Sequence, residues 1–509
     1  MSIVDFINKY KYLYWFLPFS GLFLAFSQPN VLSHGGFWGV EYIGAFLLLL
    51  TMFAPKHKTS VLLAFLSGMI YWGIGLYWVV IFGVTGYIVL IILFSLLFFA
   101  LPAAVARIVE NEKLRLILFA LLFTGIEWLR SLSVYGFPAG ELGGGNINII
   151  SKTIISIGGT NFYTLFIFAV AILIILRDKK YTAIAVNTGI ILVLLALFPY
   201  VSAEFYKNFG PKEKNKIITV TLLQPATLKG ITPASMEEDD KPEEIAARNK
   251  VITNLVRQSP EADLIIMPEN IIYDQPVYPH DFPNYLAVEK DCYLLYGVIK
   301  EDPENDNIYN SAYLVNPEGE IIDEYYKRQL MPFGEFVPMR SFIQQYYPVR
   351  DVDMTRGTSD RPFKVEDIKI GVLICYDSLF SRLTMPSIEK GANLLVSITN
   401  DAWFGTTAAI FQHYGATIHR SIESGVPVIQ VGNTGVTGIY DAYDFKNNLR
   451  ELAVDEAGTS TLALVLTNRM TFFRLFGKFF GPGIFALGVL LSLWYIFFAA
   501  KIKDNYDRK

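Results

Sequence analysis

The chain has 509 residues, of which 52% are hydrophobic and 15% aromatic, and this composition excludes a single soluble domain of the ordinary kind. The formal net charge is −4 and no basic block occurs, which argues against nucleic acid as a partner. Two cysteines exclude a disulfide framework, and Cys292, in an apolar run, is expected to be an inert buried residue. The five histidines are scattered, and we interpret His413 and His419 as part of a polar helix, not of a metal site.

Hydrophobic residues concentrate in 12–201 and 478–500, whereas 202–470 has the composition of an ordinary globular domain. A helix needs about 20 apolar residues to cross a bilayer. Stretches of that kind predict eight membrane spans, at 12–29, 37–54, 61–81, 86–106, 114–133, 161–176, 182–201 and 479–500. The first stretch lacks a small-x-small cleavage site and further spans follow it, so we do not expect a cleaved signal peptide.

Basic residues are distributed unevenly over the connections between these spans. Lys or Arg occurs before the first span, in every second connection (for example Lys56, Lys58 and Arg107) and after the eighth span. The alternate loops 30–36 and 82–85 carry none. Because cytoplasmic loops are enriched in Lys and Arg, we predict that both termini are cytoplasmic and that the soluble region lies outside, in the periplasm or its equivalent.

The connection 134–160 is long and glycine-rich, with Gly-Phe-Pro-Ala-Gly-Glu-Leu-Gly-Gly-Gly at its centre. It is either a loose loop or a re-entrant or lid element, since irregular backbone at membrane depth must be covered by protein. Glu127, at the end of the fifth span, is a weak candidate for a specific role.

From Lys216 the pattern changes to short apolar runs separated by polar helices. Strands are predicted at 217–224, 263–267, 293–299, 310–316, 368–374, 394–399 and 426–432. Helices are predicted at 242–258, 379–390 and 408–424. This alternation, with paired strands near 293–326, predicts an α/β layered domain. The acidic segment 230–245 is either a solvated loop or a mobile arm near a binding site.

Three reactive side chains in this region each follow a strand-like run. Glu269 lies in Met-Pro-Glu-Asn, Lys327 follows Glu-Tyr-Tyr, and Cys375 closes Ile-Gly-Val-Leu-Ile-Cys. A thiol attacks as its thiolate, so it needs a base, here Glu269, and a nearby positive charge. Lys327 is placed to stabilise the thiolate and the oxyanion of a tetrahedral intermediate. Singly, such a Cys is more often a core residue and such a Glu or Lys a surface residue, but the unusual contexts of all three favour covalent acyl chemistry.

In the order and contexts of Glu269, Lys327 and Cys375, the soluble region resembles the nitrilase superfamily. Nearly the whole chain is similar to the apolipoprotein N-acyltransferase family of the bacterial inner membrane. The segments that carry this resemblance most specifically are 24–29 (Leu-Ala-Phe-Ser-Gln-Pro), 136–138 (Gly-Phe-Pro), 327–338 (Lys-Arg-Gln-Leu-Met-Pro-Phe-Gly-Glu-Phe-Val-Pro), 399–405 (Thr-Asn-Asp-Ala-Trp-Phe-Gly) and 433–437 (Asn-Thr-Gly-Val-Thr).

The resemblance implies an α+β membrane protein, in which a nitrilase-like αββα sandwich is inserted into an eight-helix transmembrane domain. Seven spans would lie in 1–210, the extracytoplasmic catalytic domain in 211–470, and the eighth span with a cytoplasmic tail in 471–509. Both termini would be on the cytoplasmic side of the bacterial inner membrane.

Further residues match the family's site. Glu335 matches its supporting second glutamate, and Tyr376 matches the tyrosine after the nucleophile. Asp377 stands where the family usually has Glu, one methylene longer. Residues 225–262 contain no tryptophan, whereas many members carry one in a mobile loop before the catalytic Glu. Both departures bear on substrate positioning.

The implied reaction is a ping-pong transfer. A fatty acyl chain passes from a phospholipid, through a thioester on Cys375, to the α-amine of a diacylglyceryl-cysteine at the N-terminus of an apolipoprotein. No metal, nucleotide or other cofactor is implied, and a monomer in the bilayer is expected.

Two alternatives are a membrane-anchored amide or nitrile hydrolase and a non-catalytic lipoprotein-binding module. The seven preceding spans argue against the first, since one anchor would suffice, and the intact trio argues against the second.

Overall fold

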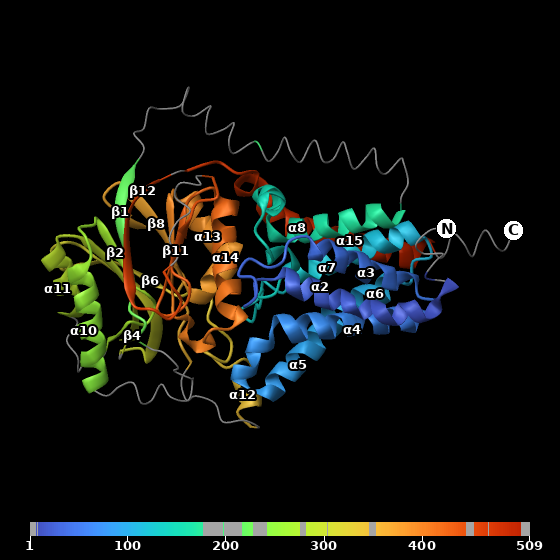
Figure 1. Cartoon of the computed structure of the whole chain (residues 1–509), viewed down its shortest axis with the longest axis horizontal. Helices are drawn as coiled ribbons and strands as arrows, with labels where there is room; N and C mark the ends of the chain where they lie inside the picture. Colours follow the sequence, from blue (N-terminus) through green and yellow to red (C-terminus); the bar gives the residue numbers. More distant parts are fainter. Residues whose placement is uncertain are drawn as a thin grey trace. The chain divides into compact units, whose positions relative to one another are not determined.

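The computed structural model describes residues 7, 9–176, 197, 216–227, 242–274, 281–302, 304–345, 353–443, 452–466 and 468–499. The chain divides into two compact units, one of Met1–Phe198 with Thr471–Lys509 and one of Pro199–Met470 (Figure 1). The predicted span 182–201, apart from Leu197, lies outside the described residues, as do 230–241 of the acidic segment and the tail from 500.

The first unit consists of apolar helices, and every predicted span inside the described residues overlaps helical structure. These helices are α2 (Ser20–Ser27), α3 (Val40–Leu50), α4 (His57–Gly75), α5 (Val84–Phe94), α6 (Leu101–Ala106), α7 (Glu112–Leu129), α8 (Ile149–Leu176) and α15 (Phe472–Trp494). A π-helical turn, Ser95–Ala100, joins α5 to α6 without a break.

Three helices among the described residues are long and apolar enough to cross a membrane, namely Val84–Ala106, Ile149–Leu176 and Phe472–Phe497. The predicted count of eight is not reached there, because several spans are interrupted. The first contains Pro18 in a 3₁₀ helix, Lys11–Phe19, ahead of α2, and a second 3₁₀ helix, Tyr77–Phe82, follows α4. Such turns shorten the continuous α-helix without removing the apolar character of the segment.

The sixth span was predicted at 161–176, whereas α8 already begins at Ile149. At Gly159, with φ of 78°, the backbone leaves the helical conformation, so that two helical stretches meet at a kink, and the predicted span corresponds to the second stretch. Residues 149–160 therefore belong to a helix and not to the outside connection.

The remaining connection, 134–148, is irregular and closely tied to the helices. The guanidinium of Arg130 donates to the carbonyls of Phe137, Pro138 and Ala139 at 2.9–3.2 Å. The buried carboxylate of Glu127 accepts the backbone N–H of Leu142 at 2.8 Å. These contacts fit the re-entrant alternative better than the loose loop, and they attach Glu127 to this segment.

The second unit contains two sheets. The first has strand order β12-β1-β2-β4-β5-β6, with β3 paired to β4, and the second has order β11-β10-β9-β8-β7. The strands of the first sheet are β1 (Ile217–Gln224), β2 (Leu264–Ile266), β3 (Ile272–Asp274), β4 (Tyr293–Asp302), β5 (Asn307–Val315), β6 (Ile321–Tyr326) and β12 (Gly458–Val465). Those of the second are β7 (Phe363–Val365), β8 (Ile368–Ile374), β9 (Leu394–Thr399), β10 (Val428–Gly432) and β11 (Gly438–Tyr440).

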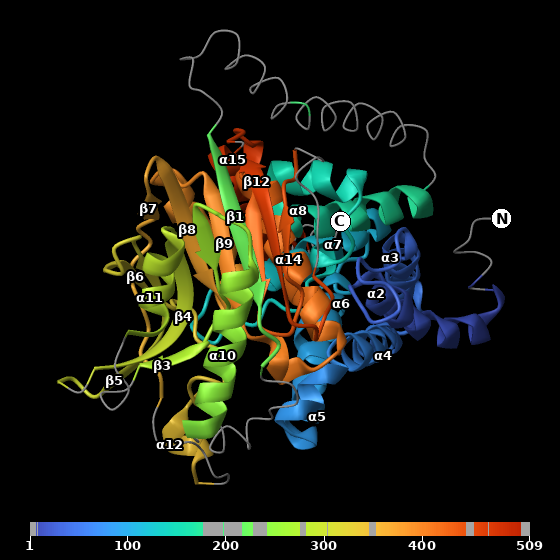
Figure 2. The same cartoon turned by 60° about the vertical axis from the view of Figure 1, so that its left-hand side comes forward.

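Helices cover the outer faces of the two sheets. On the first sheet lie α10 (Pro242–Gln258) and α11 (Asp281–Lys290), which are seen together over the strands in Figure 2. On the second lie α13 (Ser381–Glu389) and α14 (Ala408–Ser424) (Figure 1). This unit is therefore a four-layer αββα sandwich, in agreement with the predicted fold class.

Successive side chains along each strand point alternately to the core between the sheets and to the helices outside them. In β2, Leu264 and Ile266 face the core between the sheets, whereas Ile265 packs in the cluster under α10 and α11. In β9, Val396 enters the central core and Leu395 packs towards α13. Since successive strand residues point to opposite faces, a strand buried on both faces is apolar throughout. The seven predicted strands and three predicted helices of this unit are confirmed within a few residues, while β3, β7, β11, β12, α11 and the short helix α12 (Arg340–Ile343) were missed.

Candidate active site

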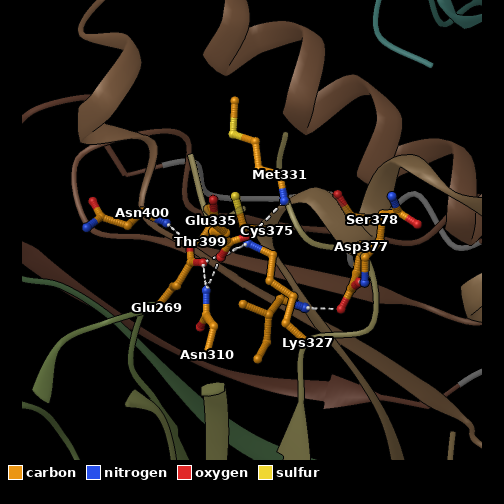
Figure 3. A network of polar contacts seen from close by, with 12 residues as sticks. Glu269, Asn310, Lys327, Met331, Glu335, Cys375, Asp377, Ser378, Thr399 and Asn400 are labelled. Carbon is orange, nitrogen blue, oxygen red and sulfur yellow. Dashed lines mark hydrogen bonds and ion pairs between the residues drawn. The ribbon is translucent and has the colours of Figure 1, made fainter. Parts of the chain in front are cut away.

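The predicted trio converges at one place between the two sheets (Figure 3). Glu269 lies three residues beyond β2, Lys327 directly follows β6, and Cys375 directly follows β8. Their relative exposures are 4%, 2% and 9%, so all three are buried. Cys375 begins a short 3₁₀ helix, Cys375–Leu379, with its backbone at φ of 47°.

A glycine allows the Glu269 segment to approach β4. Gly297 donates its N–H to the carbonyl of Pro268 at 3.1 Å. A Cβ atom at Gly297 would lie 2.5 Å from the Cα atom of Glu269, closer than side chains tolerate. The absence of a side chain at this position therefore sets the path of the backbone that carries the carboxylate.

Lys327 forms two buried ion pairs. Its Nζ lies 3.1 Å from Oε1 of Glu269 and 2.9 Å from Oε1 of Glu335. Burial lowers the pKa of Lys327, but the negative charges of Glu269 and Glu335 raise it more, so the net pKa lies well above its usual value. The side chain is an ammonium, and Glu335 is brought into the site beside the trio.

Asn310 of β5 is a site residue that the sequence analysis missed. Its Nδ2 donates to Oε1 of Glu269 and to Oε1 of Glu335, each at 2.7 Å. Two backbone amides complete the set, because Asn400 donates to Oε2 of Glu269 at 2.8 Å and Met331 to Oε2 of Glu335 at 2.7 Å. Hydrogen bonds of this kind favour the ionised form of a carboxyl group.

Cys375 is a protonated thiol in this environment. Burial raises its pKa well above the usual value, and the negative charge of Glu269 raises it further. The charge of Lys327 and a hydrogen bond from Thr399 lower it, but by less. A nucleophilic role for this thiol would need a base that removes its proton, and the carboxyl group of Glu269 lies in the same cluster.

Asp377 stabilises the loop that begins with Cys375 by accepting three hydrogen bonds. Its Oδ1 accepts the N–H of Gln329 at 2.7 Å, and its Oδ2 accepts the hydroxyl of Tyr325 at 2.7 Å and the N–H of Ile374 at 3.2 Å. The side chain is fully buried, and burial raises its pKa. Asp377 thus joins the loop after β8 to the segment around Lys327. Tyr376 is also buried, and its ring packs edge-on against that of Phe380, with centroids 5.3 Å apart.

His413 and His419 lie in the predicted helix, which is α14, and both are buried, at 7% and 1% exposure. Helix α14 packs against β10 and the loop that begins with Cys375, and its polar side chains form buried contacts. His413 contacts Asp401 and the carbonyl of Cys375, two partners that lie far from it in the sequence.

One group of possible metal ligands occurs in the described part of the chain. Sγ of Cys375, a carboxylate oxygen of Asp401 and a ring nitrogen of His413 lie within 4.8 Å of one another. Both ring nitrogens of His413 are within hydrogen-bonding distance of protein oxygens. We therefore interpret the group as a hydrogen-bonded cluster. Its spacing in sequence resembles no metal motif, which is why only the fold reveals it.

Comparison with known proteins gives two family matches. Residues 220–462 match the carbon-nitrogen hydrolase family, and residues 20–173 match the apolipoprotein N-acyltransferase N-terminal domain. Among solved structures, Nit3 of Saccharomyces cerevisiae, a member of branch 10 of the nitrilase superfamily, is 18% identical, with a TM-score of 0.36, and the match covers 49% of this chain and 90% of that one.

Two sequence relatives extend over most of the chain. The apolipoprotein N-acyltransferase of Pasteurella multocida is 24% identical over 471 residues, which is 86% of each chain. That of Geobacter metallireducens is 30% identical over 475 residues, which is 87% of each chain. Since the relatives span both units and each unit matches its own family model, this chain belongs to the apolipoprotein N-acyltransferase family.

Proposed function

We propose that this chain is a bacterial membrane enzyme that transfers a fatty acyl chain from a phospholipid to the N-terminal α-amine of a diacylated apolipoprotein. The observation that carries the proposal is the buried cluster of Cys375, Glu269 and Lys327 in a chain whose other unit is made of apolar helices. Membership of the family supports a phospholipid and a diacylated apolipoprotein as the two substrates. The buried cluster supports acyl transfer through a thiol.

In the first half-reaction, Glu269 removes the proton from Cys375, and Sγ attacks the ester carbonyl of the phospholipid. Two of the three ammonium protons of Lys327 are directed to carboxylates. The third is available to the oxyanion of the tetrahedral intermediate. When the intermediate collapses, Glu269 returns its proton to the departing alkoxide, giving a lysophospholipid and an acyl thioester on Cys375.

In the second half-reaction, the free amine of the diacylglyceryl-cysteine attacks the thioester. Glu269 accepts a proton from the amine, the new amide bond forms, and Sγ leaves as a thiolate. Glu269 then returns this proton to Cys375, so the site is restored. Glu335 holds Lys327, and Asp377 and Tyr376 support the loop of the nucleophile.

The topology remains part of the proposal: eight spans, both termini in the cytoplasm, and the catalytic unit at 211–470 in the periplasm. The uneven distribution of Lys and Arg over the loops supports it. Reporter fusions after residues 34, 84 and 330, and after 57 and 110, test it. Periplasmic activity is expected for the first three only, and the opposite pattern would refute the orientation.

The activity is tested by incubating the purified enzyme with a phospholipid labelled in its acyl chain. An acyl adduct on Cys375 is expected by mass spectrometry, and a diacylated lipopeptide should discharge it with transfer of the label. The Cys292→Ser variant, which alters the other thiol, should behave like the wild type. An adduct on another residue would refute the mechanism, and release of free fatty acid without transfer would indicate a hydrolase.

A further inference from the structure

The peptide of the nucleophile adopts a conformation that needs support. Cys375 has φ of 47°, in the left-handed region that non-glycine residues rarely adopt. Such a conformation persists only where surrounding contacts determine it. The carbonyl of Cys375 receives a contact from outside its own loop, and the donor is His413 of α14.

His413 connects three segments. Its Nε2 lies 3.0 Å from the carbonyl oxygen of Cys375 and 2.9 Å from Oγ of Ser378. Its Nδ1 lies 2.8 Å from Oδ1 of Asp401, which also accepts the hydroxyl of Thr399 at 2.9 Å. The residue next to Asp401 is Asn400, whose N–H binds the carboxylate of the proposed base.

The partners of His413 decide its protonation state. A backbone carbonyl can only accept a hydrogen bond, so Nε2 must carry a proton to bind the Cys375 oxygen. An ionised carboxylate can also only accept, so Nδ1 must carry a proton to bind Asp401. Only the imidazolium, paired with the Asp401 carboxylate, donates to both oxygens, whereas a neutral imidazole protonated at Nδ1 would accept the hydroxyl of Ser378 at Nε2 and leave the Cys375 carbonyl unbound.

We infer that His413 and Asp401 form an ion pair that positions the nucleophile, in which the imidazolium holds the strained peptide of Cys375 and Asp401 holds the imidazolium. This inference rests on the proposed role of Cys375. Neither residue touches the reacting atoms through these contacts, so both are positioning residues.

The charged groups around His413 agree with this state. Burial lowers the pKa of His413, but the charge and hydrogen bond of Asp401 raise it more, with smaller contributions from the Cys375 carbonyl and the charge of Glu269. The contributing groups lie on three segments: Asp401 follows β9, Cys375 follows β8, and Glu269 follows β2. The net pKa is raised from its usual value, so the ion pair is present below that raised pKa and is lost when the pH rises through it.

The pH dependence of the first half-reaction tests the pair. Release of lysophospholipid in a single turnover is measured from about pH 6 to 9.5 for the wild type and for Asp401→Asn and His413→Gln. The wild type should lose rate on the alkaline side as His413 loses its second proton. In Asp401→Asn the charge that raises the pKa of His413 is gone, so this alkaline decline should begin at least about one pH unit lower. His413→Gln should be about 10- to 100-fold slower, without that decline.

His419→Gln is the matched control, because His419 is also a buried histidine of α14. Burial lowers its pKa to about 3, so it does not titrate in this range, and its variant should keep the wild-type profile. An alkaline decline that stays in place or moves upward in Asp401→Asn would overturn the inference. So would a metal ion bound to wild-type protein and lost in His413→Gln. If Asp401→Asn fails to fold, the pH–rate profile of His413→Gln tests the inference alone, and an alkaline decline that persists in this variant would overturn it.

The two proposals fail in different ways. A wild-type enzyme that forms no acyl adduct on Cys375 would refute the proposed function. If the wild-type enzyme forms the adduct but the His413→Gln variant has the same pH–rate profile as the wild type, only the ion pair is refuted.

Discussion

Glu269 and Glu335 are held by the same two side-chain donors. Oε1 of each accepts from Lys327 Nζ and from Asn310 Nδ2, and Oε2 of each accepts one backbone N–H. Two carboxylates and one ammonium leave a net charge of −1 in a buried site, which would be costly without these donors. The arrangement holds the carboxyl group of Glu269 in one position, while Glu335 keeps Lys327 in place.

Asn310→Ala removes a donor that both carboxylates share. We expect the free energy of unfolding to fall by about 2–3 kcal/mol, because two buried charged acceptors each lose a hydrogen bond. Acyl-enzyme formation should fall by about 100-fold, since Glu269 is no longer held. Thermal unfolding and lysophospholipid release measure the two effects. Asn316→Ala, which alters a surface turn, should change neither, and a wild-type rate in Asn310→Ala would contradict the assignment.

Glu269→Gln should have opposite effects on two properties of Cys375, the reactivity of its thiol towards alkylation and its activity in acyl transfer. The negative charge of Glu269 raises the pKa of the thiol, so its removal lowers that pKa. In a Cys292→Ser background, iodoacetamide should alkylate Cys375 of Glu269→Gln faster than that of the wild type at about pH 8–9. Acyl transfer should nevertheless fall at least about 1000-fold, because the base is lost. Peptide mapping by mass spectrometry measures the alkylation, and slower alkylation of the variant would refute this account.

Gly297→Ala should disturb Glu269 without changing any polar group. The added methyl group would lie 2.5 Å from the Cα of Glu269, so the segment must move. We expect a loss of about 1–3 kcal/mol in unfolding free energy and a strong loss of acyl-enzyme formation. Gly458→Ala in the same sheet is the control, since its nearest contact would be 3.8 Å away. Equal effects of the two substitutions would show that Gly297 does not position the base.

Asp377→Glu introduces the residue that the family usually carries. The three donors to Asp377 surround a side chain of this length, so the longer Glu should cost about 1–3 kcal/mol of stability. Because the carboxylate points to the segment of Tyr325 and Gln329, the preference among acyl chains should not change. Unfolding and competition between two labelled phospholipids measure these effects, and a changed preference would place Asp377 at the substrate. Asp360→Glu, on the surface, is the control.

Prediction from the sequence succeeded where local patterns carry the information. Buried strands such as 217–224, 368–374 and 394–399 are short runs made mostly of apolar residues, and the structure has them with those bounds. It failed for short elements such as β3 and β11, whose three residues are too few to show a period. It also missed the helical stretch of α8 that precedes the kink at Gly159, because that stretch was included in the outside connection 134–160.

The sequence by itself determined the layered α/β unit, the apolar helices and the three reactive side chains at strand ends. These follow from periodicity, from composition and from residues in unusual contexts. Only the tertiary structure decided that Asn310, Asp401 and His413 join them. Asn310 and His413 lie in ordinary local contexts, and Asp401 lies in the specific segment 399–405, but the importance of all three arises from pairing and packing between segments 12–41 residues apart. Contacts of this kind depend on how the two sheets meet, and no local spacing encodes them.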